Sequence, residues 1–156
     1  MSATTSIAGV HTTGLLKPIL IGGTIAGILD ITSAFISGGW QVPRGVAGGL
    51  LGPSARNSTG IGVWILGLAI HFFIAFCAAT VYCLASRMLP FLKEHFVVCG
   101  MFYGIAVFLT MYLVVMPLCA FHFKGPYPLR LLLQGIIVHM LLIGLPIGFS
   151  LSRWGK

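Results

Sequence analysis

The chain has 156 residues, of which 58% are hydrophobic and 7% are charged. A soluble domain carries about a quarter charged residues and cannot bury this much apolar surface, so these values exclude a water-soluble fold. The net charge of +7 comes from Lys and Arg side chains that stand singly or in pairs near the ends of apolar runs. That placement is typical of membrane anchors and argues against a nucleic-acid-binding surface.

Four apolar runs follow one another along the chain, and each is about 20 residues long. A helix of that length crosses the ~30 Å hydrocarbon core of a bilayer at 1.5 Å per residue. The runs therefore predict an all-α membrane protein, a four-helix bundle forming a single integral membrane domain over residues 1–156, with Pro18 in the first turn of the first helix. The predicted transmembrane helices cover residues 18–37, 61–86, 96–119 and 131–152.

Residues 38–60, between the first and second predicted helices, differ from the rest of the chain. The segment reads GGWQVPRGVAGGLLGPSARNSTG, is dense in Gly and Pro, and is too short to cross the membrane as a helix. Irregular backbone at membrane depth must be buried in protein or wetted. We therefore expect an interfacial or re-entrant segment here.

A weak internal repeat relates the two halves of the chain. GLAIH in the second helix matches GIIVH in the fourth, and the first and third helices each carry Gly-x-x-x-Gly. The pattern favours a duplicated two-helix hairpin, and small residues at this spacing let helices pack closely in lipid. The glycines expected at helix contacts are Gly23, Gly27, Gly67, Gly100, Gly104 and Gly135.

Ionisable residues of three different helices are predicted to reach one layer inside the membrane. Counted from the helix ends at 1.5 Å per residue, Asp30, His71 and His139 lie about 10, 15 and 12 Å below the same face. Thr110 and Tyr112 of the third helix lie at a similar depth. A charged group at mid-membrane costs at least ~2.5–3.5 kcal/mol, so such residues usually have a partner or a task.

Two interpretations of this intramembrane polar site fit the sequence without a cofactor. In the first, Asp30 and the imidazoles form hydrogen bonds that only hold the helices together. In the second, a carboxylate beside imidazoles exchanges protons and serves transport. The chain has no motif for catalysis or phosphate binding, so we expect a non-enzymatic small transporter or an accessory subunit of a larger membrane complex.

The alternative is a redox protein with a single b-type haem. His71 and His139 would supply the axial nitrogens, Gly67 and Gly135 would leave room for the porphyrin edge, and arginines at the near face would pair with the propionates. Those arginines are Arg44, Arg56 and Arg130. A metal site made of the two histidines and His122 is a weaker option, and our main expectation includes no metal or cofactor.

Several stretches resemble a family of small, uncharacterised bacterial inner-membrane proteins. They are AGILDITSAFI, GVAGGLLGPSA, HFFIAFCAATVYCLASRMLPFL, YGIAVFLTMYLVVMPLCA and HMLLIGLPIG. The resemblance implies a compact four-helix bundle in the bacterial cytoplasmic membrane but no particular activity. We expect a multi-pass protein with cytoplasmic termini, surrounded by lipid and assembled as a homo-oligomer or within a larger complex.

Overall fold

The computed structural model describes residues 13–122 and 128–155. All regular elements in these two ranges are helical, and four of the helices are long and apolar enough to cross a membrane, as predicted. The first span is α1 (Thr13–Gly38) and the second is α3 (Ile61–Met88). The third span consists of α5 (Phe96–Thr110), the π-helical turn η2 (Met111–Val115) and α6 (Met116–Leu118). The fourth span consists of α7 (Leu129–Val138), the π-helical turn η3 (His139–Gly144) and α8 (Leu145–Trp154).

The observed helices differ from the predicted ones mainly at the start of the first span. α1 begins at Thr13, so Pro18 lies inside the helix and not in its first turn. The proline removes one intrahelical hydrogen bond, the one that an N–H at position 18 would have donated to the Gly14 carbonyl in the first turn. The second span ends at Met88, two residues before Pro90, in keeping with the bias against helical backbone directly before proline.

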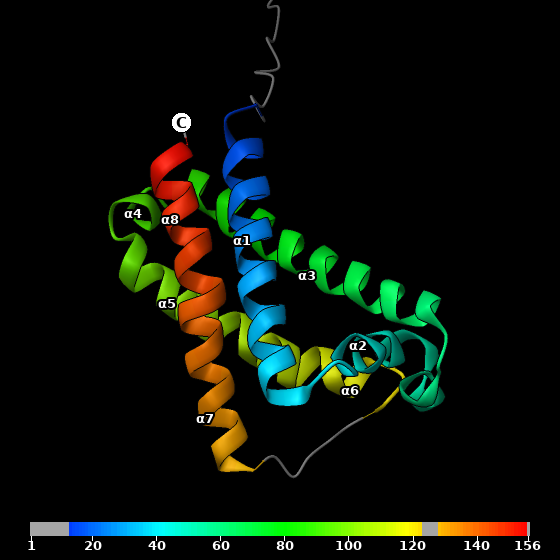
Figure 1. The fold of residues 1–156 in the computed structure, drawn as a ribbon. Helices are drawn as coiled ribbons and strands as arrows, with labels where there is room; N and C mark the ends of the chain where they lie inside the picture. Colours follow the sequence, from blue (N-terminus) through cyan, green and yellow to red (C-terminus); the bar gives the residue numbers. More distant parts are fainter. Residues whose placement is uncertain (1–12, 123–127, 156) are drawn as a thin grey trace, which may run out of the picture.

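The Gly-rich segment forms two short helices, α2 (Val42–Leu51) and the 3-10 turn η1 (Pro53–Asn57). α2 lies against α3 because Gly67 has no side chain: a β-carbon there would lie 1.7 Å from the Pro43 carbonyl oxygen. On its other side, the amide of Ala120 donates to the Gly49 carbonyl oxygen at 2.8 Å. The segment thus bridges the start of α3 and the end of the third span (Figure 1).

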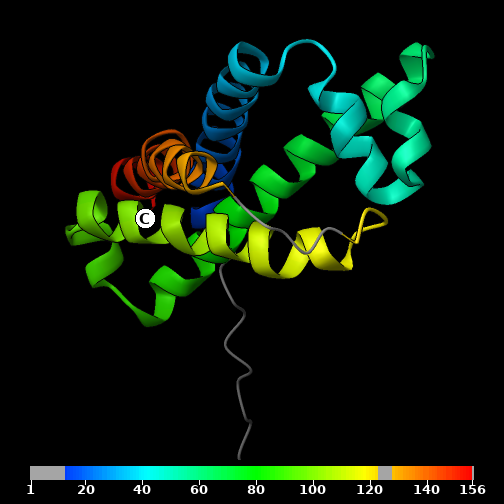
Figure 2. The ribbon, with the colours of Figure 1, turned by 90° about the horizontal axis from the view of Figure 1, so that it is seen from below.

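The spans pack as two hairpins joined through α1 and α8. α1 packs on α3, α5 packs on the fourth span, and α1 also packs on α8. Figure 1 shows α1 side by side with α8, whereas α3 and the third span cross them obliquely, and Figure 2 shows the same crossing from below. The core where these helices meet consists of small and aliphatic side chains and one tyrosine: Leu15, Ala26, Ala79, Tyr82, Cys83, Ile143, Ile147 and Leu151.

The Gly-x-x-x-Gly pairs face equivalent helices in the two hairpins. Gly23 and Gly27 of α1 admit the rings of Phe76 and Phe72 of α3. In the second hairpin, a β-carbon at Gly104 would lie 2.3 Å from the His139 carbonyl oxygen. The first helix of each hairpin therefore presents its glycines to the second, which is the arrangement that a duplicated hairpin would have.

The second and third spans are connected by α4 (Phe91–Glu94) and meet through tyrosine side chains. The Tyr103 hydroxyl donates to the Ala78 carbonyl oxygen at 2.6 Å, and the Tyr82 hydroxyl donates to the Leu92 carbonyl oxygen at 3.2 Å. The two tyrosine rings lie 4.8 Å apart. These contacts fix the turn between the hairpins at the end of the bundle where α8 terminates.

The start of the first span and the end of the fourth lie on the same side of the bundle. The Lys17 ammonium lies 5.9 Å from the centre of the Trp154 ring, and Ser150 donates a hydrogen bond to the Pro18 carbonyl oxygen at 2.9 Å. Large apolar side chains such as Phe73 and Phe102 point outward and are 68% exposed. A membrane protein presents such a surface to lipid.

Candidate intramembrane polar site

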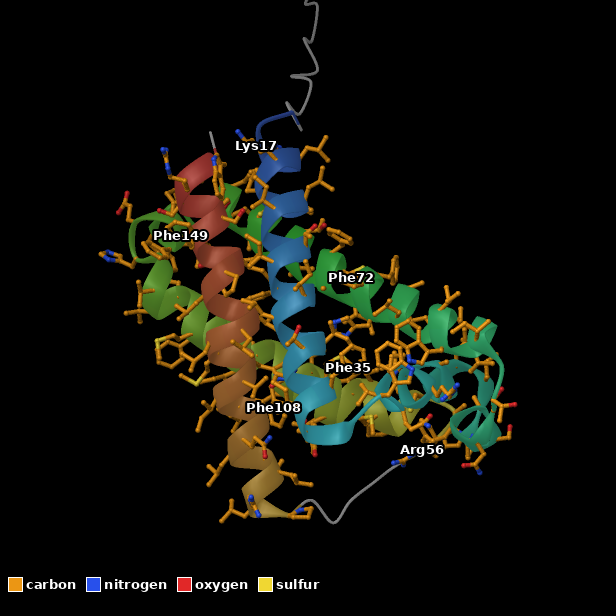
Figure 3. All side chains as sticks on the ribbon, viewed as in Figure 1. Lys17, Phe35, Arg56, Phe72, Phe108 and Phe149 are labelled. Atoms are coloured by element: carbon orange, nitrogen blue, oxygen red, sulfur yellow. The ribbon has the colours of Figure 1, made fainter. Side chains whose placement is uncertain are left out.

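The polar site begins with the contact between α1 and α3. Asp30 stands one turn beyond Gly27 on the face of α1 that carries the Gly-x-x-x-Gly pair. Because Gly27 lacks a side chain, the Phe72 ring packs directly against α1 (Figure 3), and α3 approaches closely. The His71 imidazole consequently reaches two groups of α1: its Nε2 lies 3.0 Å from the Gly27 carbonyl oxygen, and its Nδ1 lies 4.0 Å from Asp30 Oδ2.

The Gly27 carbonyl determines which nitrogen of His71 carries a fixed proton. A carbonyl oxygen only accepts hydrogen bonds, so Nε2 must be the donor in this contact. In the neutral imidazole, Nδ1 would then turn its lone pair toward Asp30, which an ionised carboxylate opposes. An N–H at Nδ1 of His71, or an O–H on the Asp30 carboxyl, would make this contact favourable.

His139 joins the same layer from the fourth span. It is the first residue of the π-helical turn η3, and its Nδ1 donates to the Gly135 carbonyl oxygen at 2.9 Å. Nε2 is left as the basic nitrogen of the ring. The turn η3 packs against α1, the helix that carries Asp30. The elements that carry Asp30, His71 and His139 thus meet through α1.

The two third-span residues predicted in the layer are placed differently from each other. Tyr112 stacks on Phe108 with ring centres 4.7 Å apart, and Phe108 meets the His139 ring edge-on at 5.2 Å. Tyr112 is therefore connected to the layer through an intervening ring. Thr110 is exposed, and its hydroxyl donates to the Ala106 carbonyl oxygen of its own helix at 2.8 Å. Thr110 is not brought to Asp30 or the histidines.

Two π-helical turns flank the site, and both have a cause in the sequence. η2 and η3 each end two residues before a proline, Pro117 and Pro146. Proline donates no hydrogen bond, and its ring clashes with the carbonyl four residues earlier, so the preceding turn is perturbed. Such π turns occur frequently at functional sites. The sequence signal for these turns is a proline inside each of the last two apolar runs.

An aromatic stack joins the end of α1 to the start of α3. The rings of Trp40 and Trp64 lie 4.5 Å apart, and Phe35 stacks on Trp40 at 5.3 Å. The indole N–H of Trp64 donates to the Trp40 carbonyl oxygen at 3.0 Å. Trp64 stands two helical turns before His71, on the same side of α3. These contacts hold the end of α1, the turn after it and the start of α3 together.

The residues do not fit a haem held by both histidines. Each ring nitrogen of His71 already faces a group of α1, namely the Gly27 carbonyl or the Asp30 carboxylate. The two glycines expected to receive the porphyrin edge are filled, since Gly135 faces the Phe108 ring and Gly67 faces α2. Within the described residues there is also no group of three or more His, Cys, Asp or Glu side chains arranged to hold a metal ion. The imidazole of His122 instead lies 3.4 Å from the Pro117 carbonyl oxygen.

No family model, no curated protein and no solved structure matches the chain. The resemblance to small bacterial inner-membrane proteins therefore stays a prediction. The chain is an integral membrane protein with four membrane-spanning helices, and the case for its function rests on the geometry of this polar layer.

Proposed function

We propose that the protein is a small, non-enzymatic membrane transporter in which Asp30 and His71 take up and release a proton inside the bilayer. The observation that carries this proposal is the 4.0 Å separation of His71 Nδ1 from Asp30 Oδ2, combined with the contact between Nε2 and the Gly27 carbonyl. A carboxylate beside an imidazole inside the membrane is a pair of groups that can exchange protons.

His139 extends the proposed proton path to the fourth span. When the Asp30–His71 pair releases its proton, Nε2 of His139 is the base that would receive it, because Nδ1 of that residue donates to Gly135. The proton would pass from Nδ1 of His71 or the carboxyl of Asp30 to His139, directly or through water. The net charge of the Asp30–His71 pair would then be one unit lower than before the transfer. The π turns that begin at Met111 and His139 give this part of the bundle two helix irregularities at which the spans can shift.

Partial exposure of the polar pair favours a second candidate, an assembly of several chains. The side chains of His71 and Asp30 are 14% and 19% exposed in the single chain. A charged pair is not stable against hydrocarbon, so water or another polypeptide must cover it. A homo-oligomer, or a larger complex in which this chain is an accessory subunit, would provide that cover.

The proposed setting is the bacterial cytoplasmic membrane with both termini in the cytoplasm. Support comes from the motif resemblance, from the placement of the first and last spans' outer ends on one side, and from the lysines and arginines near those ends. Lys17, Arg87, Lys93 and Arg153 stand near the ends of the spans on that side, whereas Arg44, Arg56 and Arg130 stand near the opposite ends, so the charge bias is small.

Proton flux in liposomes tests the proposal. The purified full-length chain is reconstituted with the pH-sensitive dye pyranine trapped inside, and a potassium gradient with valinomycin drives proton entry. We expect flux above that of protein-free liposomes, and Asp30→Asn should reduce it to that background because the amide cannot take up the proton. Glu94→Gln is the matched control: it removes the chain's other side-chain carboxylate, which is exposed in α4 outside the spans, and should leave the flux unchanged.

Two results would contradict the proposal: wild-type flux no greater than that of empty liposomes, or full flux through Asp30→Asn. The same series distinguishes a single chain from an assembly. Flux that rises in proportion to the protein-to-lipid ratio indicates a single-chain unit, whereas a steeper rise indicates that several chains form the path.

A further inference from the structure

A basic cavity lies at the end of α1, outside the polar layer. It has a volume of about 510 Å³ and is lined by Gly38, Gln41, Arg44, Arg56 and residues 57–59. These residues come from the last turn of α1, the first turn of α2, η1 and the loop before α3. The cavity therefore lies where the first and second spans leave the membrane, and Figure 3 shows Arg56 at that outer edge of the molecule.

Two glycines with left-handed backbone bring the arginines together. Gly39 (φ 71°) turns the chain from α1 into α2, and Gly52 (φ 93°) turns it from α2 into η1. Other residues adopt such φ values at a cost. The two turns fold residues 38–60 back on themselves, so that Arg44 and Arg56, twelve positions apart, line one hollow.

The positive charge of this cavity has no carboxylate to neutralise it. The chain has two carboxylate side chains, Asp30 and Glu94. Asp30 is paired with His71, and Glu94 lies in α4, between the second and third spans. The Arg44 guanidinium is held by the side-chain oxygen of Gln41 and, at 3.5 Å, by the Thr59 carbonyl oxygen.

One donor of Arg44 is without an acceptor. Nε of Arg44 is buried and has no hydrogen-bond partner among the described residues. A buried guanidinium N–H without an acceptor is unfavourable, and an anionic oxygen would relieve it. Arginine forms paired hydrogen bonds with phosphate oxygens, because its planar fork matches their spacing.

We infer that the cavity binds a phosphate group, with Arg44 and Arg56 as its ligands. At the membrane boundary this chemistry is offered by the headgroup of an anionic phospholipid, and inorganic phosphate from the aqueous phase offers it as well. The site is independent of the proton path proposed above, because it lies on a different part of the chain and uses neither Asp30 nor the histidines.

Lipid retention by the intact chain tests this assignment. The full-length protein is purified in detergent with equal amounts of phosphatidylglycerol and phosphatidylcholine, and native mass spectrometry counts the lipids that stay bound. A second arm titrates the delipidated protein with inorganic phosphate and follows binding by phosphorus NMR. The variants are Arg44→Gln/Arg56→Gln and, with charge kept but the fork removed, Arg44→Lys/Arg56→Lys. Arg130→Gln is the matched control, because Arg130 is an exposed residue outside the cavity at the start of α7.

We expect the wild type to retain phosphatidylglycerol over phosphatidylcholine and the Gln double variant to bind it about tenfold more weakly, with Arg130→Gln unchanged. Binding of inorganic phosphate that depends on the two arginines, without lipid retention, would assign the same cavity to a free anion. Retention that is equal in the wild type and both double variants, with no phosphate binding, would overturn the inference. If the Gln double variant does not fold, the Lys double variant provides the same test: its retention of phosphatidylglycerol is compared with that of the wild type at equal helical content by circular dichroism.

Discussion

Replacing Gly144 with leucine should separate the third and fourth spans and unfold much of the second hairpin. A β-carbon at Gly144 would lie 1.9 Å from the Gly100 carbonyl oxygen and 2.9 Å from the Gly104 nitrogen. Both neighbours are backbone atoms of α5, which cannot rotate away as a side chain can. Overpacking of this kind lowers the free energy of unfolding by about 1–3 kcal/mol. We expect a value near the upper end, about 3 kcal/mol, because a whole leucine side chain is added.

Titration of the protein in mixed micelles with sodium dodecyl sulfate, followed by circular dichroism, measures that loss. Gly62→Leu is the matched control: Gly62 also lies in a spanning helix, but a β-carbon there would meet nothing within 4 Å. The control should change the free energy of unfolding by less than about 0.5 kcal/mol. Equal stability of the two leucine variants would show that the spans do not pack through these glycines.

Replacing His71 with leucine should strand the Asp30 carboxylate in the membrane. Its imidazole partner, 4.0 Å away, would be gone, and a charge at this depth costs about 2.5–3.5 kcal/mol. Removing the charge as well should recover much of that loss, so His71→Leu/Asp30→Asn is expected to be more stable than His71→Leu alone. The coupling between the two substitutions should amount to about 1–3 kcal/mol.

A double-mutant cycle of wild type, both single variants and the double variant, unfolded in the same micelles, gives that coupling. His95→Leu serves as the control, because His95 is exposed at the start of α5. Additive effects of the two substitutions would mean that Asp30 and His71 do not interact, and the proton-sharing pair would have to be abandoned.

The number and approximate extent of the spans followed from the sequence because lipid imposes a simple requirement. A run of about 20 apolar residues with charges at its ends has few alternatives to a membrane-crossing helix. The start of α1 was less well determined, since residues 13–17 carry no strong boundary signal and Pro18 is compatible with several positions in a first or second turn. The two short helices of residues 38–60 were also missed, because they are held by contacts with α3 and with Ala120 that the local sequence does not contain.

Depth along the helices led to Asp30, His71 and His139, but depth alone does not give direction. Thr110 was included for its depth, yet it points away from the layer and bonds to its own helix. The haem alternative fails for a related reason. From the sequence, the missing side chains of Gly67 and Gly135 suggest room for a ligand. In the folded chain, α2 packs against Gly67 and the Phe108 ring packs against Gly135. Which groups occupy a glycine face depends on how the helices cross, and helix crossing is a tertiary property.

The carbonyl of Gly27 illustrates what sequence patterns leave out. Its contact with His71 Nε2 makes that nitrogen the donor and leaves Nδ1 facing Asp30, but a backbone oxygen cannot be recognised in a list of polar side chains. A glycine four residues after another glycine predicts close packing, and close packing is what exposes a helix carbonyl to a side chain of the neighbouring span. The missing side chain of Gly27 therefore has two effects: it lets α1 and α3 pack closely, and it brings the Gly27 carbonyl within reach of His71.

The juxtaposition of Asp30 and His71 is tested most directly by solid-state NMR of the protein in lipid bilayers. Asp30 is the chain's one aspartate, so carbon-13 aspartate labels a single carboxyl, and nitrogen-15 histidine labels five imidazoles, of which His71 is assigned by the signal lost in His71→Gln. The account predicts dipolar coupling between the Asp30 carboxyl carbon and Nδ1 of His71, consistent with the 4.0 Å separation of Nδ1 from the carboxylate oxygen. An Asp30 signal with no coupling to any imidazole nitrogen would contradict it.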